Sequence, residues 1–152
     1  MFFTRFVILN ILFVETTRST DLEESTNFWL QVLPQVIDLK QNLNQPIQLR
    51  AACGDALANI GVNVFEKLPH EKQMFLISIL TGCGCDEDST IKASAIRALA
   101  VYAVFPTLRD DLCFIENITE AVLRIMKDNN LLVRVKASWS LGNIVDALLM
   151  TK

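Results

Sequence analysis

Three stretches of the chain share one pattern and decide the fold: LRAACGDALANI at 49–60, IKASAIRALAVY at 91–102 and VRVKASWSLGNI at 133–144. They begin at positions 49, 91 and 133, so the interval between successive stretches is constant. Residues at offsets 0, 4, 8 and 11 within each stretch lie on one stripe of an α-helix. These residues are Leu49, Cys53, Leu57 and Ile60, then Ile91, Ala95, Leu99 and Tyr102, then Val133, Ala137, Leu141 and Ile144. The chain therefore contains a helix that is repeated three times.

A second helical pattern precedes each of these stretches. Apolar residues at helical spacing run through 28–39, 71–80 and 111–127. Pro34 interrupts the first pattern, and we expect it to kink that helix because proline lacks an N–H and clashes with the preceding turn. Asn44-Gln45-Pro46 and Leu68-Pro69 mark breaks between segments. The repeating unit is thus a helix, a short turn and a second helix.

The turn before the second helix carries a further signature. An acidic residue stands five positions before an aliphatic–basic pair in Asp86…Ile91-Lys92 and in Asp128…Val133-Arg134. This pattern resembles the HEAT repeat family, whose arrays have periods of about 40–47 residues and two helices per repeat. The longer stretches RALAVYAVFPTLRDD at 97–111 and VKASWSLGNIVDALL at 135–149 are also similar to members of this family. The likeness runs from about Phe28 to the end of the chain.

The resemblance implies an all-α fold, a right-handed α-solenoid of about three HEAT-like (armadillo-type) helix-turn-helix repeats. We place these repeats at about 27–68, 69–109 and 110–152, within an array that covers 27–152. Because members of the family are larger proteins with more repeats, we expect this chain to be a segment of a longer array. No polar capping helix follows the last repeat, so we also expect an apolar end face that associates with further repeats or with a second copy.

Residues 1–26 read as an apolar N-terminal extension followed by a polar linker. Positions 1–14 are almost wholly apolar, and 15–26 are rich in Ser, Thr and acidic residues. The apolar run is too short to span a bilayer. It has a basic residue near its start but no small-x-small cleavage site after it, which weighs against a secretion signal. A native start, a signal and a truncation artefact remain open interpretations.

A different face of the second helices carries polar and variable residues, at offsets 3, 6 and 10. In the family that the chain resembles, second helices line the concave side of a curved array. We therefore predict a protein-binding face formed by Asp55, Asn59, Arg97, Val101, Lys136, Trp139 and Asn143. Trp139 is an aromatic at a position that is otherwise charged. Two interpretations stay open for it, an interface anchor or a contact with a following repeat, and we expect it to be exposed.

The residues of the turn signature form a second predicted set. Asn44, Asp86 and Asp128 precede the second helices, and Arg50, Lys92 and Arg134 open them. An acid or amide at this place can bond to free N–H groups of the helix start. The resemblance further implies that the six residues form a structural ladder between repeats.

Composition narrows the classes of function. The net charge is −3, and the sequence pI is about 5.1, so we expect no direct nucleic-acid binding. The chain has one His and no nucleophile elbow, phosphate-binding loop or zinc-protease motif, so we predict that it is no enzyme and has no cofactor. Cys83 and Cys85 lack the second ligand pair of a zinc site, and we expect reduced thiols, not a disulfide framework.

These observations favour a non-catalytic protein–protein interaction scaffold whose partners are other proteins. The alternative is a nucleic-acid-associated or nucleocytoplasmic transport-type helical repeat protein. We expect an intracellular location, cytoplasmic or nuclear, and no membrane span.

Overall fold

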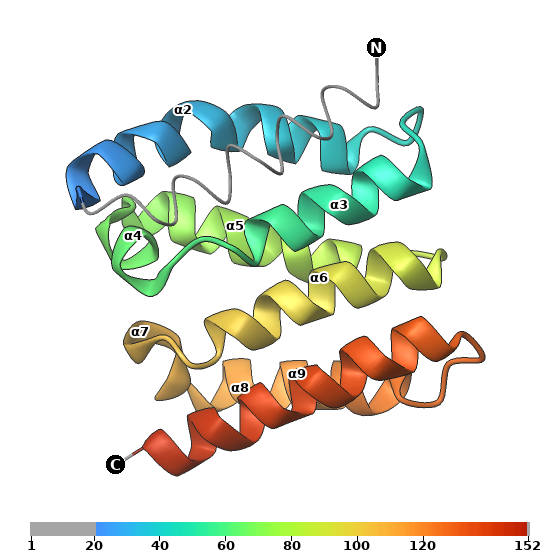
Figure 1. The fold of residues 1–152 in the computed structure, drawn as a ribbon. Helices are drawn as coiled ribbons and strands as arrows, with labels where there is room; N and C mark the ends of the chain where they lie inside the picture. The colour runs from blue at the N-terminus through green and yellow to red at the C-terminus, as the bar shows by residue number, and fades with distance from the viewer. Residues whose placement is uncertain (1–20, 152) are drawn as a thin grey trace.

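The computed structural model describes residues 21–151, and all regular structure in that range is helical (Figure 1). The predicted all-α class is confirmed. The helices are α2 (Leu22–Gln41), α3 (Ile47–Leu57), α4 (Val62–Lys67), α5 (His70–Cys83), α6 (Ser89–Tyr102), α7 (Pro106–Arg109), α8 (Leu112–Ile125) and α9 (Leu131–Met150). The apolar run 1–14 lies outside the described residues.

The start of α2 corrects one prediction. We assigned 15–26 to a linker, but the helix begins at Leu22, and the predicted boundary at 26/27 falls inside it. The physical reason is Asp21, whose carboxylate accepts hydrogen bonds from the N–H groups of Glu23 and Glu24 and so caps the helix. The two glutamates also stand in the first turn, where the helix dipole favours negative charge. The helix then continues through Pro34.

The helices pack as three successive pairs: α2 with α3, α5 with α6 and α8 with α9. The second members of the pairs, α3, α6 and α9, lie one after another, so that α6 contacts α3 on one side and α9 on the other (Figure 1). The predicted repeat boundaries fall in the connections before α5 and before α8. The short helices α4 and α7 were not predicted. Each follows the second helix of a pair. Helix α4 contacts α2, and α7 contacts both α8 and α9.

Side-chain caps fix where the later helices begin. Asp88 caps α6 by accepting from the N–H groups of Thr90 and Ile91. Asp111 caps α8, and Asn130 caps α9 in the same way. Such caps satisfy N–H groups that have no partner within their own helix.

The core lies between the two layers of helices. Ten of the twelve stripe residues predicted from offsets 0, 4, 8 and 11 are buried, and Leu49 and Leu141 are half-buried. An aromatic cluster closes the end of α6, where the rings of Phe65 and Tyr102 lie 4.8 Å apart and Phe105 lies 5.3 Å from each. The Tyr102 hydroxyl donates to the carbonyl of Leu57 at 2.7 Å, and its burial raises its pKa. Across residues 21–151, no helix has a stretch long and apolar enough to cross a membrane.

Candidate protein-interaction face

The constant interval between repeats places equivalent side chains of α3, α6 and α9 next to one another. Asp55, Arg97 and Trp139 occupy the same offset in the three helices. An Arg97 guanidinium N–H donates to the Asp55 carboxylate at 3.4 Å. The Arg97 guanidinium carbon also lies 5.0 Å from the centre of the Trp139 ring, within the range of a cation–π contact. The three predicted residues therefore form one connected group.

Lys136 completes this group from one turn away on α9. Its ammonium donates to both carboxylate oxygens of Asp55 at 3.0 Å. Because Asp55 is on α3, this contact reaches past α6 and joins the first and third pairs. One carboxylate is thus shared by two cations, which leaves one net positive charge. We call Asp55, Arg97, Lys136 and Trp139 the interaction cluster.

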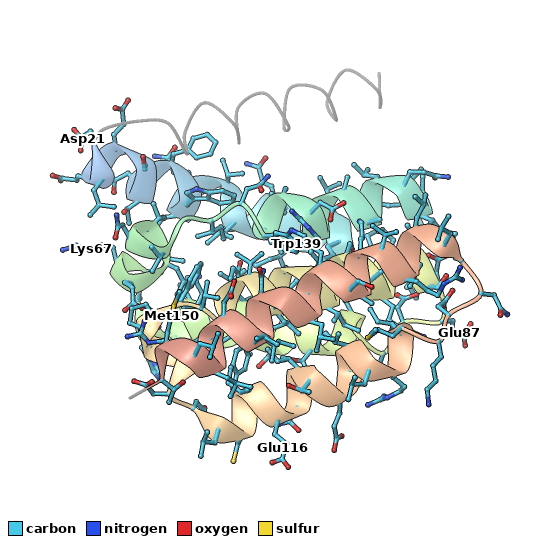
Figure 2. The ribbon with its side chains drawn as sticks, turned by 60° about the horizontal axis from the view of Figure 1, so that its bottom comes forward. Asp21, Lys67, Glu87, Glu116, Trp139 and Met150 are labelled. Carbon is cyan, nitrogen blue, oxygen red and sulfur yellow. The ribbon has the colours of Figure 1, made fainter. Side chains whose placement is uncertain are left out.

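The interaction cluster is accessible to solvent. Trp139 is 50% exposed, as predicted, and Figure 2 shows it on α9, which crosses the front of that view. Of the other predicted face residues, Val101 and Asn143 lie farther along α6 and α9, and Asn59 lies in the turn after α3. Asn59 is exposed, and Val101 and Asn143 are half-buried. A half-exposed indole held under a guanidinium has a fixed orientation, which lowers the entropy lost when a partner covers it.

A buried polar group under this face was missed by sequence reasoning. Lys40, in the last turn of α2, is fully buried, and its ammonium donates to the Arg50 carbonyl at 3.4 Å. Burial lowers the pKa of Lys40, and it raises the pKa of the neighbouring Cys53 thiol to about 11. Gly54 makes room for this lysine, because a Cβ there would lie 2.8 Å from the ammonium. In the sequence, a lysine in the last turn of a helix indicates only a favourable contact with the helix dipole. The one sequence feature that points to a buried lysine is the small residue Gly54.

Two of the residues predicted to form the ladder, Arg50 and Asp86, are joined by an ion pair, which we call a rung. The Arg50 guanidinium donates to the Asp86 carboxylate at 2.7 Å, and its Nε donates to the Lys40 carbonyl at 3.0 Å. Burial would raise the pKa of Asp86, but the Asp88 N–H and the Arg50 guanidinium outweigh it and hold that pKa below its usual value. This ion pair joins the first helix pair to the turn of the second.

The other ladder residues form no ion pair between repeats in the part of the chain that the structure describes. Within residues 21–151, no ion pair joins Lys92 to Asp128. Asp128 instead accepts from the N–H of Asn130, and Arg134 donates to carbonyls of its own turn, those of Asp128 and Asn129. Arg50 is fixed because its guanidinium can bond to a carbonyl and a carboxylate at once, whereas the lysine ammonium lacks this planar fork.

Asn44 is the remaining ladder residue, and it forms no rung. Its side chain is exposed, and its backbone N–H donates to the Asn42 side chain. An uncharged amide also gives no Coulombic attraction to a base, so charge cannot hold it to another repeat.

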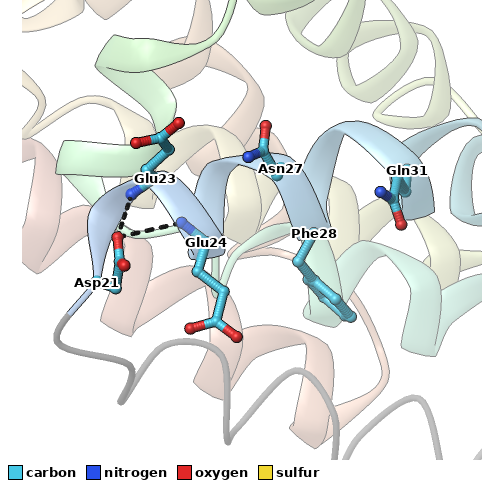
Figure 3. Close-up of a pocket in the computed structure, with 6 residues that line it drawn as sticks. All are labelled: Asp21, Glu23, Glu24, Asn27, Phe28 and Gln31. Atoms are coloured by element: carbon cyan, nitrogen blue, oxygen red, sulfur yellow. Dashed lines mark hydrogen bonds between the residues drawn. The ribbon is translucent and has the colours of Figure 1, made fainter.

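The opposite layer contains grooves between its helices. The larger, of about 510 Å³, lies between α5 and α8 over Ile96 and Leu99 of α6, and a smaller one of about 150 Å³ lies between α2 and α5. Figure 3 shows a third depression, on the first turns of α2, lined by Asp21, Glu23 and Glu24. Asp21 is already used there as the helix cap, so these carboxylates form no separate site.

No candidate metal centre occurs among the described residues, where no group of three or more His, Cys, Asp or Glu could hold an ion. All four cysteines lie in this range and none is in a disulfide. Cys85 and Cys113 are exposed, and Cys53 is buried.

Comparison with known proteins shows a distant relative but no family. No model of a known protein family matches the chain, and no solved structure shows significant similarity. A putative uncharacterized protein of Dictyostelium discoideum is 32% identical over 130 residues. The match takes in 86% of this chain but only 8% of the relative, so the chain spans a small part of that protein's length.

Proposed function

We propose that the protein is a non-catalytic protein–protein interaction scaffold, built from HEAT-type repeats that form a right-handed α-solenoid. The observation that carries this proposal is the interaction cluster. Residues at one repeated offset of three helices meet on one surface, around a half-exposed tryptophan. Tryptophan and arginine are the residues most enriched among those that dominate binding energies at protein interfaces.

The identity of the repeats is part of the same proposal. The stretches 97–111 and 135–149 resemble HEAT repeat-containing protein 6, and we propose that the chain corresponds to a segment of such a protein. The regular packing of three helix pairs supports repeats of this type. The much greater length of the Dictyostelium relative supports a longer protein.

The partner that this face fits is a protein rather than a nucleic acid. The cluster has two cations, and both contact the Asp55 carboxylate, so little positive charge is left for phosphate groups. A protein partner would pack on the Trp139 ring and hydrogen-bond with the charged groups around it. The four free thiols support an intracellular location, in the cytoplasm or the nucleus.

The test is affinity capture from cells that express the protein, with and without nuclease and moderate salt. We expect a protein partner that survives both treatments and is lost with Trp139→Ala or Arg97→Glu. Phe75→Ala is the matched control, because Phe75 is a 48% exposed aromatic on α5, in the other layer. Loss of all captured material on nuclease or salt treatment would overturn the proposal and favour a nucleic-acid-associated protein.

A further inference from the structure

The outer face of α9 carries an uncovered apolar stripe. Six residues along the helix are exposed and share this face: Leu131, Val135, Ser138, Gly142, Val145 and Leu149. At the helical rotation of about 3.6 residues per turn, they fall within an arc of about 80°. The stripe runs the whole length of α9, with large apolar side chains toward the ends and two small residues in the middle. Leu131 is 63% exposed and Leu149 is 79% exposed.

Beyond their first turns, the corresponding residues of α3 and α6 are covered by the rest of the molecule. Forty-two residues earlier in the chain, the positions equivalent to the stripe on and just after α6 are Ser89, Ala93, Ile96, Ala100 and Ala103. Ser89, in the first turn, is half-buried, and the other four are buried. On α3 the first equivalent position, Ile47, is 44% exposed, whereas Ala51, Gly54 and the C-cap Ala58 are buried. Gly54 lies so close to Ser94 of α6 that an added Cβ would be 2.5 Å from its hydroxyl oxygen. On α3, this face therefore receives the next helix. The same face of α9 continues an established mode of helix packing.

The order of residues in the stripe indicates what covers it. The pairs Leu131 and Leu149, Val135 and Val145, and Ser138 and Gly142 are each equidistant from position 140, the middle of α9. When two such helices pack antiparallel across a two-fold axis at position 140, leucine meets leucine, valine meets valine, and serine meets glycine. A two-fold interface requires this kind of self-complementary surface.

The small residues allow the two helices to approach closely at the axis. An added Cβ on Gly142 would contact nothing within the described part of this chain, so the glycine is not needed for the fold of one copy. Interaxial distances of about 8–10 Å depend on the side chains at the contact, and small residues give the shorter values. We propose that the α9 stripe is the interface of a homodimer, with a second copy of α9 packed antiparallel against it.

Measurement of the mass of this 152-residue chain by light scattering tests the interface. We expect about twice the chain mass of 17.1 kDa. Gly142→Glu places a charge at the axis and should raise the dimer dissociation constant roughly a hundredfold, because an unpaired charge is buried. Gly82→Glu is the matched control, since Gly82 is also an exposed helical glycine with open space around it, and it should leave the dimer intact. A monomeric wild type, an open-ended polymer, or equal association of both variants would overturn the proposal.

Cysteine cross-linking tests the antiparallel register. With Cys85 and Cys113 changed to serine, we would mix Val135→Cys protein with Val145→Cys protein. The mixture should form a disulfide-linked dimer, because positions 135 and 145 of the two copies face each other. Val135→Cys protein alone should not, because its two cysteines would lie about 15 Å apart along the helix. Cross-linking of Val135→Cys with itself, or no cross-linking in the mixture, would overturn the register. If the stripe instead packs against a further repeat of a longer chain, the mixture should give no cross-linking and the wild type should be monomeric.

Discussion

The two junctions between second helices share one register but differ in their chemistry. At the α3–α6 junction, Arg50 pairs with Asp86 and the Tyr102 hydroxyl reaches the Leu57 carbonyl. At the α6–α9 junction, Ile144 stands where α6 has Tyr102, and Arg134 turns back to its own loop. At the surface the interaction cluster spans both junctions, since Arg97 pairs with Asp55 of α3 and also lies over the Trp139 ring of α9. The comparison teaches that the same backbone register can carry additional inner polar contacts at one junction and lack them at the other.

The largest effect should come from filling the close contact at the first junction. Gly54→Ala would place a methyl group against Ser94 and the Lys40 ammonium, and overpacking of this kind costs about 1–3 kcal/mol. We expect a loss near the top of that range, since both neighbours are fully buried. Urea denaturation measures the change. Gly82→Ala is the control and should be neutral or stabilising by up to about 1 kcal/mol. Similar stabilities for the two variants would mean that Gly54 is not a close contact.

The next largest effect on stability should distinguish Asp86, which forms an ion pair with Arg50, from Asp128, which forms none. Asp86→Ala leaves the buried Arg50 charge without its carboxylate and should lower the free energy of unfolding by about 2 kcal/mol. Asp128→Ala removes only the bond to the Asn130 N–H and should cost about 0.5–1 kcal/mol. Denaturant titration of both variants at pH 7 gives the comparison. Equal losses would contradict the difference between the two junctions.

The dependence of stability on acidic pH gives a second test of the Arg50–Asp86 ion pair. The pKa of Asp86 is lower in the folded protein than its usual value of 3.8. Its contribution to stability is therefore fully present above that value and is lost as the pH falls through the lowered pKa. In denaturant titrations, Asp86→Ala should have a shallower loss of stability below about pH 4 than the wild type.

A smaller effect is expected from the buried lysine of the first junction. The pKa of Lys40 is lowered from 10.5 in the folded state, so the unfolded chain binds this proton more readily. The stability of the wild type should therefore rise as the pH increases toward 10.5. Lys40→Met should remove this part of the rise and gain about 1 kcal/mol at pH 7, because a buried charge is replaced by an apolar group of similar size. Lys72→Met, at an exposed position, should keep the rise. A loss of stability in Lys40→Met would show that the bond to the Arg50 carbonyl dominates.

The smallest effect on stability belongs to the interaction cluster. Lys136 and Asp55 are more than a quarter exposed, and ion pairs at such positions contribute about 0.2–1 kcal/mol. Lys136→Gln should therefore change the free energy of unfolding by less than about 1 kcal/mol. A loss well above that range in denaturant titration would assign Lys136 a structural role at the second junction.

The sequence predicts the backbone better than the side-chain contacts. The constant interval between repeats located the three second helices, and apolar spacing located the three first helices. The offsets 0, 4, 8 and 11 identified the core stripe, because burial repeats with the helical period. The contacts among the residues at offset six were not part of the prediction, which placed them only on one face. The pattern did not indicate which ladder residues would form an ion pair, since a salt bridge depends on side-chain reach and competing bonds, which a repeat pattern does not contain. The start of α2 was missed because a polar first turn that is well capped looks like a linker.

Photo-cross-linking from the interaction cluster tests the central claim most directly. A benzoylphenylalanine would replace Trp139 in one protein and Phe75 in another, and both would be irradiated in cells that express the protein. The account predicts that position 139 captures a distinct protein in a nuclease-resistant adduct, whereas position 75, on the other layer, does not. Capture of that protein from position 75 alone, or capture of nucleic acid from position 139, would contradict it.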